Sequence, residues 1–388
     1  MKGRFINYFF LFVFSTLLFI LERGEMFKRF ASDEDSSFAA LSYIIVAMIA
    51  LSGFYILVNK RYLLHTKLLI RYTTTMIVIY VLTIIWSLFY PLSSRNVYGY
   101  FLLPVFVFAF MNVITRLIDK QSIIVHTLYV VGVLCAAYYL FNYTNNTYYD
   151  VERQSNTSYT VLYFFPIMLC TPKKWLRYVA IGLVVLIVML SLKRGGFVAV
   201  LFAVAVYLYI SQISLKGKRL KIWGMIVFLV LCAVAYLAVI RINSVLLGNM
   251  MFDRLSLIEE TGGSGRESIY RDVLNLIASS RPVNFLFGHG WCATERDSFF
   301  HLTAHNDFLE ILYDFGIIAF VLYIMVIVEL FKLAKVLIKH KSDYAPALGS
   351  SIAIFIVNSM VSHIWIYCQY LLIFAVFWGV VSAVDQRK

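Results

Sequence analysis

Three residues of this sequence pair a chemically useful side chain with a position where it could meet a substrate. Arg194 interrupts two apolar segments and is followed by two glycines, and Arg266 follows the Gly/Ser-rich stretch 262–265. At a helix N-terminus, free amide groups, the helix dipole and a guanidinium all favour a bound anion. His305 stands among polar residues, and histidine is the commonest proton acceptor in catalysis. The sequence therefore predicts two anion-binding arginines and one general base.

Each of these residues also has an ordinary interpretation. The segment around Arg194 could be a tight turn whose basic side chains extend to the membrane surface. Gly195 and Gly196 would, however, let a phosphate approach the backbone. The stretch before Arg266 could be a simple turn before a helix, and a loop histidine is usually structural or solvated. The functional interpretation requires that the three side chains lie close together in the fold, whereas the ordinary interpretation does not.

Further residues are candidates for supporting roles on the same face. They are Lys193, Arg254, Tyr270, Arg271, His289, Asn306 and Glu310. His363 falls in a very short outer loop and is a weak competitor for the role of base.

A metal site could be drawn from the acids Asp33, Glu34 and Asp35, or from Glu295, Asp297, His301 and His305. Neither group has the spacing of a specific metal site, and solvated acidic loops explain both groups better. The five cysteines predict neither a disulfide framework nor a zinc site. No metal and no other cofactor is expected.

The elements that must position these residues are membrane-spanning helices. Of the 388 residues, 61% are hydrophobic and 14% are charged, with a mean hydropathy of +0.81. These values lie far outside the range of soluble domains, and apolar runs of the roughly 20 residues that a span needs recur along the chain. The formal net charge of +13 resides mostly in short loops that set orientation, so no nucleic-acid partner is expected.

The sequence predicts a single polytopic domain over residues 1–388 with about twelve transmembrane helices. The expected spans are 6–21, 38–58, 72–90, 98–113, 122–141, 158–170, 178–192, 195–211, 222–245, 316–338, 346–362 and 367–384. Alternate loops are basic and therefore cytoplasmic, whereas the other loops carry nearly all the carboxylates. An even number of spans places both termini in the cytoplasm. The first span is expected to be retained and to end before Glu22.

One outer segment, 243–315, is much longer than the other loops, and loops of this length are usually functional. It is expected to contain an amphipathic helix over 267–279 whose apolar stripe is formed by Ile269, Val273, Leu276 and Ile277. A second helix is expected to start at 305 or 306, capped by Asn306 or Asp307, and to run straight into the span near 316. His305 would then lie at a helix start.

Four motifs together carry a resemblance to a known family. In chain order they are SLKRGG, GSGRESIYRDVL, LFGHGW and AHNDFLEILYDFGIIA. Their order, spacing and side of the membrane resemble the O-antigen ligase and O-antigen polymerase superfamily of bacterial envelope polysaccharide assembly, best over residues 190–325. Tyr270, where the family often has tryptophan, and Ala319, shortly after Gly316, depart from the pattern and weaken a subfamily assignment.

The resemblance implies an all-helical membrane glycosyltransferase of the C type that needs neither a nucleotide sugar nor a metal. Such an enzyme transfers a glycan from an undecaprenyl-diphosphate carrier to an acceptor hydroxyl on the outer face of the plasma membrane. Arg194 and Arg266 match the arginines thought to grip the diphosphate, and His305 matches the histidine thought to activate the hydroxyl. Fixed cations and one base suffice for this chemistry, and inversion at the sugar carbon is expected.

Three functions stay open. A polymerase of O-antigen, capsule or exopolysaccharide is slightly favoured over a ligase that moves a finished chain to lipid A core. A transporter or flippase of lipid-linked sugars belongs to another class, and it would carry charges deep within its spans, which are nearly uncharged in this sequence. The expected partners are the glycan donor, a glycan or lipid A core acceptor, membrane lipids and other polysaccharide-assembly proteins of the bacterial inner membrane.

Overall fold

The computed structural model describes residues 2–30, 36–89, 97–145, 151–191, 193–216, 266–365 and 368–384. Within these ranges the chain is helical and contains no strand. The fourteen α-helices are α1 (Lys2–Phe30), α2 (Ser36–Val58), α3 (Lys67–Ser87), α4 (Val97–Leu117), α5 (Gln121–Asn145), α6 (Val151–Leu169), α7 (Lys174–Leu190), α8 (Arg194–Lys216), α11 (Arg266–Ala278), α12 (Pro282–Phe287), α13 (Ala293–Asp297), α14 (Asp307–Lys339), α15 (Ala345–Val361) and α16 (Cys368–Val384). A 3-10 helix, η1 (Lys60–Tyr62), lies between α2 and α3.

These helices agree with the predicted all-helical membrane class. They overlap eleven of the twelve predicted spans, and the ninth, 222–245, lies outside the described residues. Six segments are long and apolar enough to cross a membrane, namely Phe5–Gly24, Leu41–Val58, Lys67–Ser87, Gln121–Tyr143, Gly195–Ile213 and Asp307–Lys339. Four shorter apolar helices accompany them, so the number of twelve spans stays a prediction.

The first helix is longer than predicted. Instead of ending before Glu22, α1 continues to Phe30, and the side chain of Glu22 is buried. Leu21 and Met26 on either side of it are also buried. Because the apolar packing of α1 continues past position 22, the charged residues there do not end the helix.

Helix α16 forms the centre of the bundle. All residues from Gln369 to Ala383 are buried, as expected for a helix that is apolar around its whole circumference. Trp378 packs edge-on against Tyr72 of α3 and Phe355 of α15, and its Nε1 donates to Ser351 Oγ at 3.1 Å. Helices at the periphery instead expose large apolar side chains, which in a bilayer face lipid; examples are Phe12, Val46, Val81 and Phe202.

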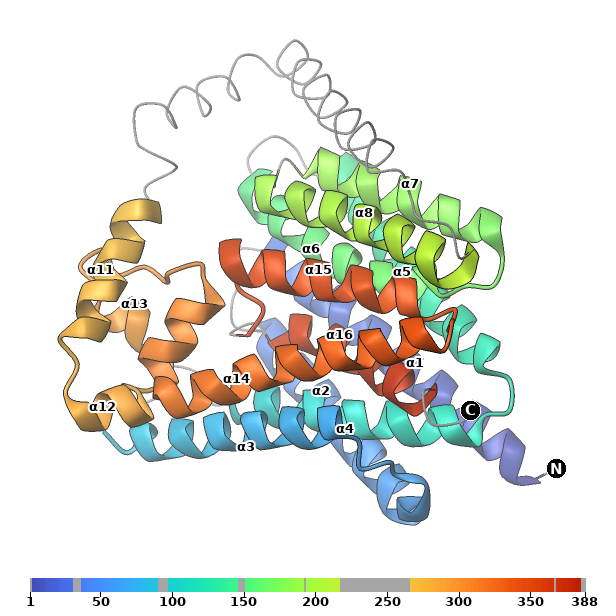
Figure 1. Ribbon diagram of the computed structural model, residues 1–388, viewed down its shortest axis with the longest axis horizontal. Coiled ribbons are helices and arrows are strands. Elements are labelled where there is room, and N and C mark those ends of the chain that lie inside the picture. The colour runs from blue at the N-terminus through green and yellow to red at the C-terminus, as the bar shows by residue number, and fades with distance from the viewer. Residues whose placement is uncertain are drawn as a thin grey trace, which may run out of the picture.

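The bundle has two distinct ends (Figure 1). The short helices α11, α12 and α13 gather at the left end, where all three contact α14. The N-terminal end of α1 and the C-terminal end of α16 lie toward the right end. The predicted topology, in which both termini lie in the cytoplasm, stays a prediction.

Helix α14 begins at Asp307, just after the predicted start at 305 or 306, and it does not run straight into the bundle. The Asn306 side chain caps it by accepting hydrogen bonds from the amides of Phe308 and Leu309. At Gly316 the backbone turns to φ 76° and ψ 177°, so the predicted uninterrupted helix is wrong. A side chain at this glycine would collide with the Leu286 carbonyl of α12. The break therefore lets α12 pack directly on the α14 backbone.

Candidate active site

Helix α11, at the left end of the bundle (Figure 1), begins at Arg266. The predicted amphipathic helix is confirmed, and its apolar stripe packs inward through Ile269, Val273, Leu276 and Ile277. Arg266 Nη1 donates to the Val361 carbonyl at 2.8 Å, and one turn later the Tyr270 hydroxyl donates to the Met360 carbonyl at 3.2 Å. Carbonyls in the last turn of a helix have no partner within it. Both residues thus dock α11 onto the end of α15.

Helix α8 reaches the same end of α15. It begins at Arg194, as predicted, and a Cβ atom at Gly195 would lie 2.8 Å from Val361 Cγ2 and 3.3 Å from Tyr159 Oη. The glycine therefore permits close packing among α8, α15 and α6, which corrects the interpretation that it makes room for a phosphate. The side chain of Arg194 and the whole of Arg254 lie outside the described part of the chain.

His305 lies beside this junction, in the loop before α14. It precedes the helix by two residues rather than starting it, and its backbone has φ 52°, the left-handed region that side chains disfavour. Its backbone N–H donates to Glu310 Oε1 at 3.0 Å, which stabilises this conformation. Its ring packs against the ring of His363 with centroids 4.4 Å apart and an interplanar angle of 41°.

The electrostatic environment keeps His305 uncharged at neutral pH. Burial, followed by His363 and then the positive charges of Arg266 and Lys193, lowers the pKa of His305 from 6.5 to about 4. Two predicted residues, Arg266 and His305, thus come together, with Lys193 close enough to act electrostatically. A neutral imidazole beside cations is suited to accept a proton near a bound anion.

The sequence interpretation underestimated His363. The short segment between α15 and α16 carries it into the interior, where its side chain is 4% exposed. Its Nδ1 lies 3.1 Å from Glu310 Oε2 and its Nε2 lies 3.0 Å from Thr303 Oγ1. Burial is also the main reason that the pKa of His363 falls to about 4. The sequence signal for His363 was its position in a very short loop at the outer end of two predicted spans.

Asn306 and Glu310, both predicted as supporting residues, join the same cluster. Besides capping α14, Asn306 donates from Nδ2 to the Met360 carbonyl at 3.3 Å. Glu310 contacts both histidines, through the backbone of His305 and the ring of His363. The start of α14 is thereby tied to α15 and to the segment that follows it.

Asp307, Glu310 and His363 bring one ligand atom each within 4.8 Å of the others and could hold a metal ion. Their hydrogen bonds already explain the carboxylates, because Asp307 accepts from the amides of Ile364 and Trp365 at 3.1 to 3.3 Å. Such bonds link α14 to the segment between α15 and α16. Of the groups weighed in the sequence, the set around Asp297 forms no comparable cluster among the described residues, and the acids of 33–35 lie outside them.

Two predicted supporting residues are engaged elsewhere. Arg271 is exposed on α11 and pairs with Glu267 at 3.0 Å. The ring of His289 stacks on Tyr313 with centroids 4.2 Å apart, and its backbone N–H donates to the Asp314 carbonyl at 3.0 Å. His289 therefore belongs to the packing of α12 and α13 against α14.

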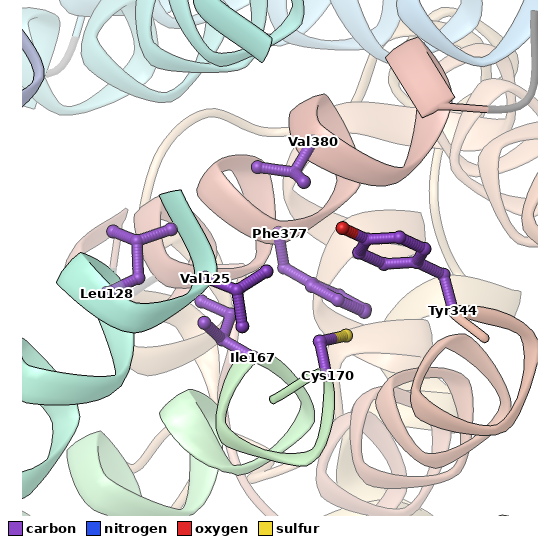
Figure 2. Close-up of a pocket in the computed structure, with 7 residues that line it drawn as sticks. All are labelled: Val125, Leu128, Ile167, Cys170, Tyr344, Phe377 and Val380. Carbon is purple, nitrogen blue, oxygen red and sulfur yellow. The ribbon is translucent and has the colours of Figure 1, made fainter. Parts of the chain in front are cut away.

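A small cavity lies away from this cluster (Figure 2). It is lined by Val125, Leu128, Ile167, Cys170, Tyr344, Phe377 and Val380. Cys170 directly follows the end of α6 and Tyr344 precedes the start of α15, so the cavity is near the helix ends opposite the histidines. Its lining is almost entirely apolar, which suits packing rather than chemistry.

The chain is similar to a known protein family over part of its length. Residues 179–324 match the family model described as O-antigen ligase. The matched region is less than half of the 388-residue chain, yet it contains Arg194, Arg266 and His305. It supports the O-antigen ligase and polymerase superfamily for this chain. A search of curated proteins returns no match.

Proposed function

We propose that this protein transfers a glycan from an undecaprenyl-diphosphate carrier to an acceptor hydroxyl on the outer face of the bacterial inner membrane, without a metal. The observation that supports this best is the position of neutral His305 beside Arg266 and Lys193. This combination offers cations to a diphosphate and a free base to a hydroxyl. The match of residues 179–324 to the O-antigen ligase family model supports it.

Among the described residues, a single hydrogen bond engages the side chain of Arg266, which leaves donors for a diphosphate. A guanidinium carries five N–H groups, and the bond from Nη1 of Arg266 to Val361 uses one of them. We assign Arg194, at the start of α8, to the same diphosphate. As the bond between the sugar carbon and the diphosphate breaks, negative charge grows on the leaving group, and fixed cations stabilise it.

Donor binding would also activate the base. Arg266 and Lys193 lower the pKa of His305 in the free protein. A diphosphate paired with these cations offsets their charge, so the pKa of His305 rises when the donor is bound. His305 then takes the proton of the acceptor hydroxyl, whose oxygen attacks the sugar carbon from the face opposite the diphosphate, with inversion.

We favour a polymerase that adds repeat units of O-antigen, capsule or exopolysaccharide over a ligase acting on lipid A core. A transporter or flippase is the alternative of another class. The observation in its favour is the buried carboxyl of Glu22 inside α1, since buried ionisable groups in spans often mark transport paths. The cations and the uncharged histidine at one end of the bundle favour transfer instead.

Two arginines on one helix provide a matched test. Arg266→Gln should weaken binding of undecaprenyl diphosphate to the purified protein about tenfold or more, because charge-assisted bonds are lost. Arg271→Gln should bind as the wild type does, because Arg271 is exposed and paired with Glu267. Affinity is measured from the ligand-dependent shift in Tm in detergent, and size-exclusion chromatography checks folding. Equal affinity of both variants for this ligand would contradict the diphosphate assignment.

A further inference from the structure

His363 belongs to a hydrogen-bonded chain of three residues. The proposed transfer mechanism has so far given this chain no role. Glu310 Oε2, both ring nitrogens of His363 and Thr303 Oγ1 lie in sequence, at 3.1 Å and 3.0 Å. A carboxyl, an imidazole and a hydroxyl in this order are the arrangement by which enzymes orient a hydroxyl group. The three residues come from α14, the segment between α15 and α16, and the loop before α14.

The buried members of the chain cannot reach a substrate, but its last member can. The side chains of His363 and Glu310 are 4% and 2% exposed. Thr303 is half-buried and lies two residues before His305. The His363 ring contacts both of these residues, through the hydrogen bond to Thr303 and through ring packing with His305. Thr303 and His305 thus both contact one buried, hydrogen-bonded ring.

A hydroxyl group has one donor and two acceptor positions. When the protein engages one of them in a hydrogen bond, the others point in defined directions. Thr303 Oγ1 has such a bond to His363 Nε2. A sugar hydroxyl that approaches His305 can therefore form a second hydrogen bond to Thr303. Two contacts fix the attacking oxygen better than one, and correct orientation of the attacking group is a large part of catalysis.

We propose that Thr303 binds the attacking hydroxyl of the acceptor sugar beside His305, and that His363 and Glu310 are positioning residues that hold Thr303 in place. This inference rests on the proposed function and adds an acceptor subsite to it. The proton of the acceptor still passes to His305, and the diphosphate still leaves with the bonding electrons. Thr303 gains and loses no covalent bond.

The test uses purified full-length protein and undecaprenyl-diphosphate-linked oligosaccharides extracted from cells that encode this chain. Thr303→Val keeps the shape of the side chain and removes the hydroxyl, and it should reduce glycan transfer about tenfold or more. Its affinity for undecaprenyl diphosphate should stay within about twofold of wild type. Thr303→Ser should restore most of the transfer. Ser280→Ala, which removes a hydroxyl bonded only locally to the Leu276 carbonyl, is the control and should transfer as wild type.

A double-mutant cycle separates positioning from a general structural role. His363→Phe keeps a ring against His305 but removes both hydrogen bonds, so it should lower transfer as Thr303→Val does. The double variant should be no worse than the single ones, because both break the same chain. Should His363→Phe fail to fold, the comparison of valine with serine at 303 still decides.

The outcomes distinguish the two proposals. No transfer by the wild type would overturn the proposed function, and this inference with it. Wild-type transfer that Thr303→Val leaves unchanged would overturn the acceptor subsite alone. Additive losses in the double variant would contradict the positioning of Thr303 through His363.

Discussion

At the residue scale, the unusual feature is a pair of uncharged histidines that face each other. Burial is the first cause that lowers the pKa of His305 and of His363 to about 4, from the ordinary 6.5. An imidazole that is uncharged at neutral pH has a lone pair available at once. Among the described residues none is hydrogen-bonded to the ring of His305, whereas both ring nitrogens of His363 are occupied by Glu310 and Thr303.

These pKa values predict how stability depends on pH. Between about pH 6.5 and pH 4 each of these two histidines binds more protons in the unfolded chain than in the folded chain, because the folded pKa values lie below the ordinary value. The contribution of the neutral histidines is therefore complete above pH 6.5 and is lost as the pH falls toward 4. The slope is at most about 1.4 kcal/mol per pH unit for each histidine. As the pH falls through this range, the wild type should lose more Tm in detergent, or gain less, than His305→Gln, because the variant lacks the contribution of His305.

A second histidine of the same loop provides a matched control for the pH prediction. His301 is exposed in the same loop, so His301→Gln should leave the slope as in the wild type. If His305→Gln and the wild type lose Tm equally over the same pH range, the pKa of His305 is not lowered in the folded protein.

Part of this cluster could be predicted from local sequence. Arg266 and Asn306 stand next to helix starts, where anion binding and capping have recognisable patterns, and His305 stands among polar residues. The pairing of His363 with Glu310 could not be predicted, because the two residues lie 53 positions apart and only the fold brings them together. The glycine at 195 was misinterpreted for the same reason, since its neighbour Val361 belongs to a distant helix.

At the element scale, two glycines hold the outer helices on the bundle. Gly288 ends α12 with φ 79°, and Gly316 breaks α14 with φ 76°. A side chain at Gly288 would collide with the Asp314 carbonyl, and one at Gly316 with the Leu286 carbonyl. The direct backbone contact of α12 with α14 thus requires glycine at both positions.

Substitution of either glycine should loosen this contact. Gly288→Ala or Gly316→Ala should destabilise the protein by about 1–3 kcal/mol from backbone strain alone, and by more because of the collisions. Gly182→Ala in α7 is the control: no other atom lies within 4 Å of its Cβ position, so its effect should be neutral or stabilising by up to about 1 kcal/mol. Thermal unfolding in detergent measures all three. A Tm unchanged by Gly316→Ala would contradict the packing argument.

The long helices could be predicted from apolar length, because a bilayer demands about 20 such residues in succession. The stripe of α11 was equally visible, since its period is that of a helix. The helices α12 and α13 are only 6 and 5 residues long and carry no comparable period. The break at Gly316 depends on a contact with α12, so a pattern confined to α14 could not reveal it.

At the scale of the whole molecule, the short helices next to the proposed site and the terminal ends of α1 and α16 lie at opposite ends of the bundle (Figure 1). Arg266 begins α11, His305 lies between α13 and α14, and His363 packs against His305. Helices α11 to α13 lie at the left end of the bundle, whereas the N-terminal end of α1 and the C-terminal end of α16 lie toward the right end (Figure 1). Basic loops alternate with acidic ones along the sequence. The arrangement of the helix ends and the alternation of the loops together predict that the cluster faces outward and that the termini face the cytoplasm.

Cysteine labelling tests this orientation. In a background without the five native cysteines, Asn275→Cys on α11 should react with a membrane-impermeant maleimide in right-side-out vesicles. Asp343→Cys, in the loop between α14 and α15, should react only after the membrane is opened. Both positions are exposed in the structure. The reverse pattern of labelling would invert the predicted topology and place the cluster in the cytoplasm.

The proposed transfer depends on His305 as the base at the outer end of the bundle. The most direct measurement is the rate of transfer from undecaprenyl-diphosphate-linked glycan by purified His305→Ala, with His301→Ala as the control and monodispersity in detergent as the check on folding. General-base catalysis predicts a loss of at least about 100-fold in His305→Ala and none in His301→Ala. Near-wild-type transfer by well-folded His305→Ala would contradict the assignment of His305 as the base.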